Sequence, residues 1–369
     1  MGKAKRVLIY RIGSLGDTLV AIPSLHLVAR AFPDAERRLL TNFPVSAKAA
    51  PAAGIIGASG LVSGYFRYAV GTRSVVELAR LWWTLQRWKP DVLVYLGPAR
   101  GVKAAERDAR FFRLCGIREQ IGVPVTAGMQ GNFFGAASGA GLEDWEPEAA
   151  RLARNIVELG DARLEEASSW DLKLTAAERE AAAKAVGAEA MGMPRIAVSI
   201  GTKVQTNDWG AGNWTALLGR LAEARPGYAL LLAGAAGESE ASEAITVGWR
   251  TGGGGPVVNL CGKLSPRESA AAFAGAKVYA GHDSGPMHLA AAMQVPCVAI
   301  FSARNVPRVW FPYGAEHWVL YRRVDCMGCG LETCVVEKKK CILGILVEEV
   351  FEEVVGVLGG SGQWVEGKG

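Results

Sequence analysis

The sequence lacks the features that would assign it at once to a membrane, secreted or nucleic-acid-binding class. None of its apolar runs reaches the ~18 uncharged residues of a membrane-spanning helix. The first run, Val7 to Tyr10, is interrupted by Arg11, and no small-residue signal-peptide cleavage site follows it. The net charge of +5 at pH 7 is too weak to predict a nucleic-acid partner, although it leaves acidic partners open. We therefore expect a cytoplasmic protein with no nucleic-acid partner.

The sequence also lacks the fingerprint of a dinucleotide-binding domain. Its first glycine-rich turn, Gly13-Ser14-Leu15-Gly16-Asp17, follows an apolar run but has no third glycine to complete G-x-G-x-x-G. This absence argues against a dehydrogenase.

What the sequence does contain is an alternation of apolar runs and amphipathic segments. Its 369 residues exceed the roughly 250–300 that one core accommodates, which predicts two domains, 1–170 and 171–369. In the first half we predict strands at 6–12 and 91–96 and helices at 18–31 and 74–88. In the second half we predict strands at 195–200, 228–233, 257–261, 277–280 and 295–301, with helices between them. This pattern indicates an α/β protein with two doubly wound, Rossmann-like domains that face a central cleft.

The first motif that carries chemistry is the turn from Gly13 to Asp17. Its glycines let the backbone approach a ligand closely, and the helix predicted to follow points its N-terminus at the turn. The alternative interpretation is that Asp17 only caps that helix.

The second motif is Gly281-His282-Asp283-Ser284-Gly285-Pro286-Met287-His288, which follows a predicted strand and begins a helix. Ser284 suits the N-cap, and Gly285-Pro286 suits a first turn whose missing N–H costs nothing. The helix N-terminus would favour a diphosphate, and Asp283 would accept hydrogen bonds from sugar hydroxyls. The alternative for His288 is a histidine satisfied within the core.

In this order and separation, the two motifs resemble the heptosyltransferase family (glycosyltransferase family nine), whose members make the inner core of bacterial lipopolysaccharide. Residues 7–17 resemble the family's N-terminal signature, and 281–292 resemble its donor-site signature. The segments 201–209 and 259–265 resemble two further family segments. The resemblance implies a GT-B fold and inverting, metal-independent transfer of heptose from ADP-heptose. It assigns acceptor binding to 1–170 and nucleotide-sugar binding to 171–369.

The resemblance also implies roles for individual residues. Asp17 matches the catalytic base that takes the proton of the acceptor hydroxyl. Lys203 matches the lysine that stabilises the departing diphosphate, and Glu238 matches an acidic residue near the nucleoside. The complete set implied for the nucleotide sugar is Gly16, Thr202, Lys203, Glu238, Asp283, Ser284, Gly285 and His288. Two positions depart from the family pattern: His282 stands where Asn is frequent, and 204–208 lacks a basic residue before the tryptophan.

A row of basic residues in the first half is a candidate acceptor site. If 101–114 is a helix, bases spaced by three or four residues form one stripe: Arg100, Lys103, Arg107, Arg110 and Arg113. An anionic, lipid-linked saccharide acceptor would bind such a stripe, with peripheral contact at the inner face of the cytoplasmic membrane. The alternative is a solvated helix face.

Four of the seven cysteines gather in the segment 325–342: Cys326, Cys329, Cys334 and Cys341. In a cytoplasmic chain this spacing favours a metal over a disulfide, and four thiolates would hold a structural zinc ion. The alternative is a loop of reduced thiols. Catalysis itself is expected to need no cofactor.

Two other functions fit the same architecture. A nucleotide-sugar epimerase would form product from the donor alone. A non-catalytic nucleotide-sugar-binding protein would bind the donor without turnover, although it would have no need of a base at Asp17.

Overall fold

The computed structural model describes residues 4–42, 51–69, 72, 74–133 and 145–360. The chain divides into two compact units, Met1–Lys173 and Leu174–Gly369. Within the described ranges, no helix combines the length and the apolar character needed to cross a membrane.

The first unit is built on a parallel sheet of five strands in the order β3-β2-β1-β4-β5. The strands are β1 (Arg6–Tyr10), β2 (Glu36–Asn42), β3 (Gly64–Tyr68), β4 (Val92–Tyr95) and β5 (Glu119–Ile121). The helices are α1 (Leu15–Leu19), α2 (Ile22–Ala31), α3 (Ala53–Ile56), α4 (Val75–Trp88), α5 (Val102–Leu114), α6 (Ala127–Gln130) and α7 (Glu148–Asn155), followed by the 3₁₀ turns η2 (Val157–Leu159) and η3 (Ala167–Trp170). Strands β1 and β4 are almost wholly apolar because helices cover both faces of this sheet.

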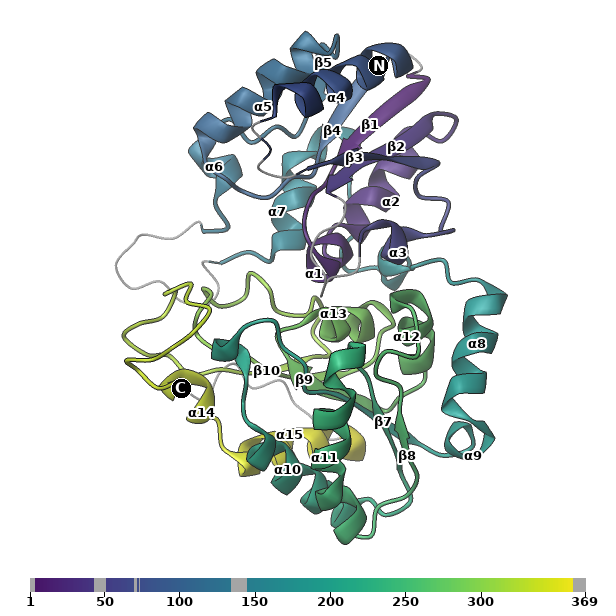
Figure 1. Ribbon diagram of the computed structural model, residues 1–369, viewed down its shortest axis with the longest axis vertical. Coiled ribbons are helices and arrows are strands. Elements are labelled where there is room, and N and C mark those ends of the chain that lie inside the picture. The colour runs from purple at the N-terminus through teal and green to yellow at the C-terminus, as the bar shows by residue number, and fades with distance from the viewer. Residues whose placement is uncertain (1–3, 43–50, 70–71, 73, 134–144, 361–369) are drawn as a thin grey trace. The chain divides into compact units, whose positions relative to one another are not determined.

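Each face of the first sheet has its own helices. Leu8 and Tyr10 of β1 pack with Leu85 of α4 and Phe112 of α5 in one core cluster. Helices α2 and α7 contact one another and cover the opposite face, as Figure 1 shows.

The second unit is built on a parallel sheet of six strands in the order β11-β10-β9-β6-β7-β8. The strands are β6 (Arg195–Ser199), β7 (Ala229–Leu232), β8 (Val257–Asn259), β9 (Val278–His282), β10 (Cys297–Ile300) and β11 (Trp318–Leu320). The helices are α8 (Ala176–Val186), α9 (Ala188–Met191), α10 (Ala211–Ala224), α11 (Ser239–Thr251), α12 (Pro266–Phe273), α13 (Gly285–Ala292), α14 (Lys340–Leu343) and α15 (Val347–Gly359), with the 3₁₀ turns η4 (Gln205–Asn207) and η5 (Ala236–Glu238).

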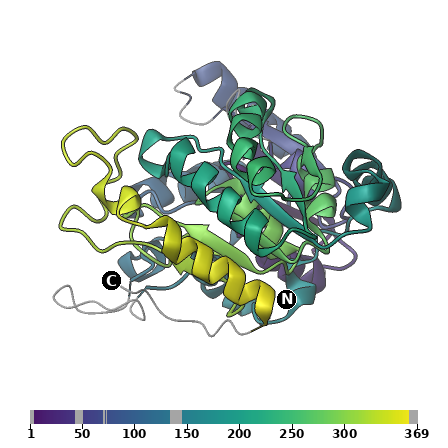
Figure 2. The same cartoon turned by 90° about the horizontal axis from the view of Figure 1, so that it is seen from below.

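Helices also cover both faces of the second sheet. Helix α10 packs between α11 and α15, and Figure 2 shows α15 running beside it. Three fully buried tryptophans, Trp209, Trp214 and Trp249, fill the core beneath these helices. On the other face, α12 contacts α8 and α13, and Phe273 of α12 meets Tyr279 of β9 with ring centroids 5.5 Å apart.

Both sheets are parallel and doubly wound, which confirms the predicted α/β class. The single helix predicted at 18–31 is wrong, because the structure has α1 and α2 with a break at Val20 and Ala21. Pro23 stands in the first turn of α2, where its missing N–H is tolerated, but it cannot continue the hydrogen bonds of α1.

Candidate active site

In both units the strand order changes direction at one point, between β1 and β4 in the first sheet and between β6 and β9 in the second. In open α/β sheets, ligands bind outside the carboxyl ends of the strands at such a switch point. The sequence-predicted site residues follow these strands. Asp17 comes after β1, Lys203 after β6 and Asp283 after β9, while Glu238 comes after β7, next to β6.

Asp17 is held against the turn that precedes it. Its Oδ2 accepts hydrogen bonds from the backbone N of Ser14 at 2.7 Å and from the Ser14 hydroxyl at 2.9 Å. Gly13 has a φ of +137°, and a Cβ built there would lie 2.4 Å from the Asp17 Cγ. Asp17 therefore does cap helix α1, but a quarter of its side chain (25%) stays exposed, so capping does not remove it from reach of a ligand.

Beneath Asp17 lies Arg11, whose side chain is only 1% exposed. Its Nε donates to the main-chain oxygen of Asp17 at 2.8 Å, and its Nη1 donates to that of Leu96, just after β4, at 2.8 Å. Nη2 stands 3.7 Å from the Asp17 carboxylate. Arg11 thus ties together the two loops that follow β1 and β4, on either side of the switch point.

A second buried ion pair balances the charge of Arg11. Glu148 of α7 lies 3.8 Å from Arg11 and accepts two hydrogen bonds from Arg151, at 2.6 and 2.8 Å. Arg151 also donates to the main-chain oxygen of Gly97, after β4, at 3.3 Å. The two arginines and the carboxylates of Asp17 and Glu148 form a group of zero net charge, so their mutual attraction offsets part of the desolvation cost of burying these ions.

Arg100 lies near the same strand ends but is engaged inside the unit. It forms an ion pair with Asp108 and donates to the hydroxyls of Tyr10 at 3.1 Å and Tyr95 at 3.3 Å. Burial, followed by the negative charge of Asp108, raises the pKa of Tyr95 to about 12, so this phenol stays protonated.

The predicted basic helix is present as α5, but its stripe begins at Lys103 rather than at Arg100, which precedes the helix. Lys103, Arg107 and Arg110 are exposed on one side of α5. Arg110 pairs with Glu106 at 3.8 Å and Arg107 with Asp108 at 3.6 Å. These exposed ion pairs are weak, so both guanidinium groups stay available to an anion.

In the second unit, Lys203 is exposed in the loop after β6. The neighbouring Thr202 closes this loop on itself, because its hydroxyl donates to the oxygen of Val204 at 3.1 Å. Asp208, at the end of the loop, is held by Lys339, whose Nζ lies 3.2 Å from the carboxylate. The loop is therefore fastened at both ends while Lys203 stays accessible.

Glu238 lies across two glycines at the ends of β6 and β7. A Cβ built on Gly201 would stand 2.2 Å from the Glu238 carboxylate carbon, and one built on Gly234 would stand 2.3 Å from its Oε2. The backbone N of Ala235 donates to the same Oε2 at 2.8 Å. The structure therefore brings Glu238 beside the loop that carries Thr202 and Lys203.

Asp283 and the start of α13 stand on the other side of β6. Two amides face Asp283: Asn305 Nδ2 lies 3.5 Å from its carboxylate, and Asn207 Nδ2 lies 3.5 Å from its main-chain oxygen. Ser284 is the N-cap of α13, as predicted, with extended backbone. His288 is 6% exposed, which fits the alternative of a core histidine as well as a place in the site.

His282, the last residue of β9, joins this loop to the Lys203 loop. Its Nε2 accepts from the backbone N of Trp209 at 3.2 Å and from the indole of Trp214 at 3.3 Å. Burial lowers the pKa of His282 to about 4, so the ring is neutral at physiological pH and Nε2 is free to accept. The sequence singled out His282 only as a departure from the family pattern.

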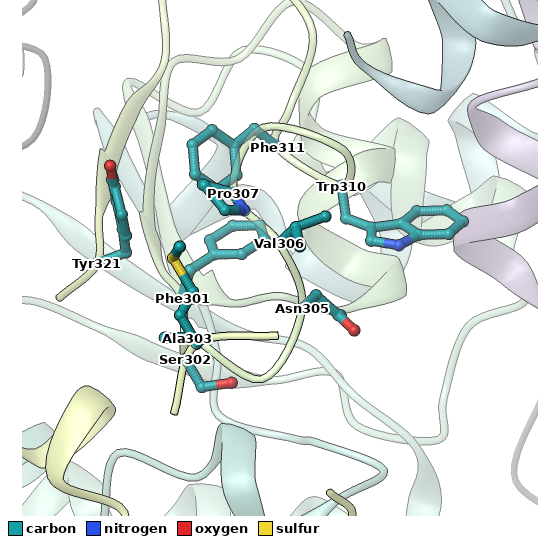
Figure 3. A pocket seen from close by; sticks show the side chains of 10 residues that line it. Phe301, Ser302, Ala303, Asn305, Val306, Pro307, Trp310, Phe311 and Tyr321 are labelled. Carbon is teal, nitrogen blue, oxygen red and sulfur yellow. The ribbon is translucent and has the colours of Figure 1, made fainter. Parts of the chain in front are cut away.

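A small aromatic pocket lies after β10 (Figure 3). It is lined mainly by Phe301, Phe311, Pro307 and Tyr321, and its free volume of about 10 Å³ holds no more than a water molecule. Trp310 also contributes to its lining, and Figure 3 shows its indole to one side of the phenylalanine rings. The rings pack the loop rather than bind a ligand, and that loop positions Asn305 against Asp283.

The predicted zinc site is not supported. Among the described ranges, no three His, Cys, Asp or Glu side chains come together as a metal would require. Cys334 Sγ instead accepts from the backbone N of Lys339 at 3.4 Å, and Cys341 packs partly against the core of the second unit. All four thiols are free in the structure.

Sequence reasoning missed the residues that hold the site rather than form it. Arg11, Glu148 and Arg151 are buried charges from distant segments. The one signal at sequence level was a charged residue, Arg11, at the end of an otherwise apolar strand.

Comparison with known proteins identifies the family. Residues 151–340 match the family described as glycosyltransferase family 9 (heptosyltransferase). A curated relative, lipooligosaccharide heptosyltransferase 2 of Campylobacter jejuni, is 31% identical over 107 residues, covering 28% of this chain and 33% of that protein. The chain thus spans about a third of the length of the curated relatives it matches.

Solved structures resemble the chain over nearly its whole length. A glycosyl transferase family 9 protein from Veillonella parvula has a TM-score of 0.72 and 18% identity, covering 97% of this chain and 98% of its own. The ADP-heptose lipopolysaccharide heptosyltransferase II of E. coli has a TM-score of 0.66 and 17% identity, covering 96% and 99%. Together with the two parallel-sheet units, these similarities confirm the predicted GT-B fold.

Proposed function

The chain belongs to glycosyltransferase family 9 (heptosyltransferase), and we propose that it transfers heptose from ADP-heptose to an acceptor of the lipopolysaccharide inner core. The observation that supports the proposal is that Lys203, Glu238 and Asp283 each follow a strand at or beside the switch point of the second unit. A cation, a carboxylate and a helix N-terminus beside one switch point suit a nucleoside diphosphate sugar. The named donor of the E. coli relative, ADP-heptose, supports the choice of sugar.

In the proposed reaction an acceptor hydroxyl attacks the anomeric carbon of the donor. A new carbon–oxygen bond forms, the bond from that carbon to the diphosphate oxygen breaks, and ADP leaves. Asp17 takes the hydroxyl proton, and Lys203, with the N–H groups at the start of α13, offsets the charge that grows on the diphosphate. Glu238 accepts from the ribose hydroxyls, and Asp283 from the sugar. No cofactor takes part.

The first unit is the proposed acceptor side. Lys103, Arg107 and Arg110 would bind the phosphates and carboxylates of a lipid-linked saccharide, and Arg100, which is paired with Asp108 and 27% exposed, would contribute less. A lipid-linked acceptor would bring the enzyme to the inner face of the cytoplasmic membrane.

The test is ADP release from ADP-heptose in the presence of a core acceptor. Asp17→Asn keeps the shape of the side chain and an oxygen for Ser14, but it removes the base. We expect turnover to fall about 10²–10⁴-fold, with donor affinity nearly unchanged. Asp34→Asn, at an exposed position of the same unit, is the matched control.

Unchanged turnover in Asp17→Asn would exclude Asp17 as the base. Conversion of the donor without an acceptor would indicate an epimerase, and donor binding without any turnover would indicate a non-catalytic binding protein.

A further inference from the structure

Helix α4 presents an apolar and basic stripe to solvent. Its buried side, through Leu81, Leu85 and Trp88, packs against the sheet of the first unit. On the opposite side Val76, Arg80, Trp83 and Arg87 follow one another at spacings of four, three and four residues, which places them on one face. All four are exposed, Val76 to 68% and Trp83 to 57%. The outward face of such a helix is ordinarily polar, so these exposed apolar groups need an explanation.

The stripe widens where α4 meets the end of α5. The Trp82 indole donates to the main-chain oxygen of Leu114 at 2.9 Å, and the Gln86 amide donates to the same atom at 3.1 Å. Trp82 is 42% exposed and Leu114 is 72% exposed. We call the surface formed by Val76, Arg80, Trp82, Trp83, Arg87 and Leu114 the Trp82–Trp83 face.

An arginine and a tryptophan of this face are stacked on one another. The Arg87 guanidinium lies over the Trp83 ring, 5.4 Å from its centroid. Trp82, Trp83, Gln86 and Arg87 line an open depression rather than an enclosed pocket. An open surface of this kind suits a broad partner better than a small molecule, for which enclosure is typical.

We propose that the Trp82–Trp83 face docks the first unit on the surface of an anionic phospholipid bilayer. Tryptophan is the side chain that favours the membrane–water interface, and arginines beside it are attracted to anionic headgroups. A second copy of the chain fits less well, because a symmetric contact would place the positive charges of Arg80 and Arg87 against the same charges of the other copy. The inference deepens the proposed function, since Leu114 ends the helix that carries Lys103, Arg107 and Arg110, the proposed acceptor stripe.

The experiment is co-sedimentation of the full chain with vesicles, without donor or acceptor. One set of vesicles is phosphatidylcholine alone, and the other also contains phosphatidylglycerol. The variants are the double substitutions Trp82→Ala with Trp83→Ala and Arg80→Gln with Arg87→Gln. Val157→Ala, at an exposed position (68%) elsewhere in the same unit, is the matched control, and thermal unfolding midpoints verify that each variant folds.

We expect binding to anionic but not to neutral vesicles, weakened by added salt. The tryptophan pair should lose about tenfold in partition coefficient, and the arginine pair about fivefold for each charge removed. The control should bind like the wild type. The proposal is overturned if the wild type does not sediment with anionic vesicles, if the variants bind unchanged, or if the face instead supports a dimer that the substitutions dissociate. Vesicle binding by a protein without heptosyl transfer would refute the proposed function and leave this inference standing.

Discussion

The Nε of Arg11 donates a 2.8 Å hydrogen bond to the main-chain oxygen of Asp17, so a fully buried cation holds the backbone of the proposed base. The relationship has two consequences. The backbone of the turn is fixed before a ligand arrives, and the Asp17 carboxylate has a positive charge 3.7 Å away. Arg11 is therefore a positioning residue, since it acts through Asp17.

Arg11→Met should destabilise the protein by about 3–5 kcal/mol, because it removes a buried cation and leaves the buried Glu148 and the partly exposed Asp17 with one arginine. Urea unfolding measures the loss. Arg163→Met, which removes an exposed arginine (53%) paired with Glu166 at 3.7 Å, should change stability by less than about 0.5 kcal/mol. Equal effects of the two substitutions would contradict the charge balance inferred around Arg11.

Gly201→Ala should weaken binding of the nucleotide sugar, because its Cβ would take the space of the Glu238 carboxylate, 2.2 Å away. The neighbour is a side chain, so the fold should tolerate the change while Glu238 is displaced. Titration calorimetry with the donor measures this, and we expect a loss of about tenfold or more, the ratio that ~1.4 kcal/mol produces. Gly212→Ala, in α10 with open space around it, is the control and should bind normally.

Stability should fall as the pH drops from about 6.5 toward 4. Burial lowers the pKa of His282 from 6.5 to about 4, so in this window the unfolded chain binds a proton that the folded chain excludes. The contribution of His282 is complete above pH 6.5 and is lost toward pH 4, with a maximum of ~3 kcal/mol. Burial lowers the pKa of His317 to about 4 as well, so its contribution has the same sign.

The measurement is the urea midpoint as a function of pH for the wild type and for His282→Asn. The variant should lose a clear part of the acid sensitivity, and His317 accounts for part of the remainder. An unchanged pH profile in His282→Asn would mean that His282 titrates alike in both states.

Protein purified without added metal should contain less than about a tenth of an equivalent of zinc or iron, and a chelator should leave its unfolding midpoint unchanged. The reason is that Cys334 and Cys341 are engaged elsewhere in the described part of the chain. Metal analysis and calorimetry with EDTA provide the test. One equivalent of bound metal, lost in Cys326→Ser, would restore the original zinc hypothesis.

The sequence predicted the buried strands, because their apolar residues distinguish them from the surrounding loops. Strands β7 and β10 are continuous apolar runs, and β6 and β9 are apolar except at their ends; each was predicted within about two residues. By contrast, β2 (ERRLLTN) and β3 (GYFRY) carry charges and aromatic residues that hide their period, so the sequence did not predict them. The break between α1 and α2 was missed because the apolar spacing continues through Pro23.

The residues of the candidate site also fall into those that the sequence could indicate and those that it could not. Asp17, Lys203 and Asp283 follow strands that the sequence predicts, so sequence and resemblance could single them out as candidates. Their supports come from contacts that spacing does not reveal, such as Glu148 beside Arg11, or Asn305 beside Asp283. Lys339, within the cysteine segment 325–342, pairs with Asp208 in the same way.

The strand order also has a kinetic consequence. In the second sheet β6 pairs with β9, so Ile196 lies beside Val278 although β7 and β8 stand between them in the chain. Closing so long a loop is slow compared with forming the local βα units. The Lys203 loop after β6 and Asp283 after β9 are therefore brought side by side only by that long-range pairing. Recovery of donor binding during refolding should lag behind recovery of helical signal, and a chain that stalls between the two would have helices but no site.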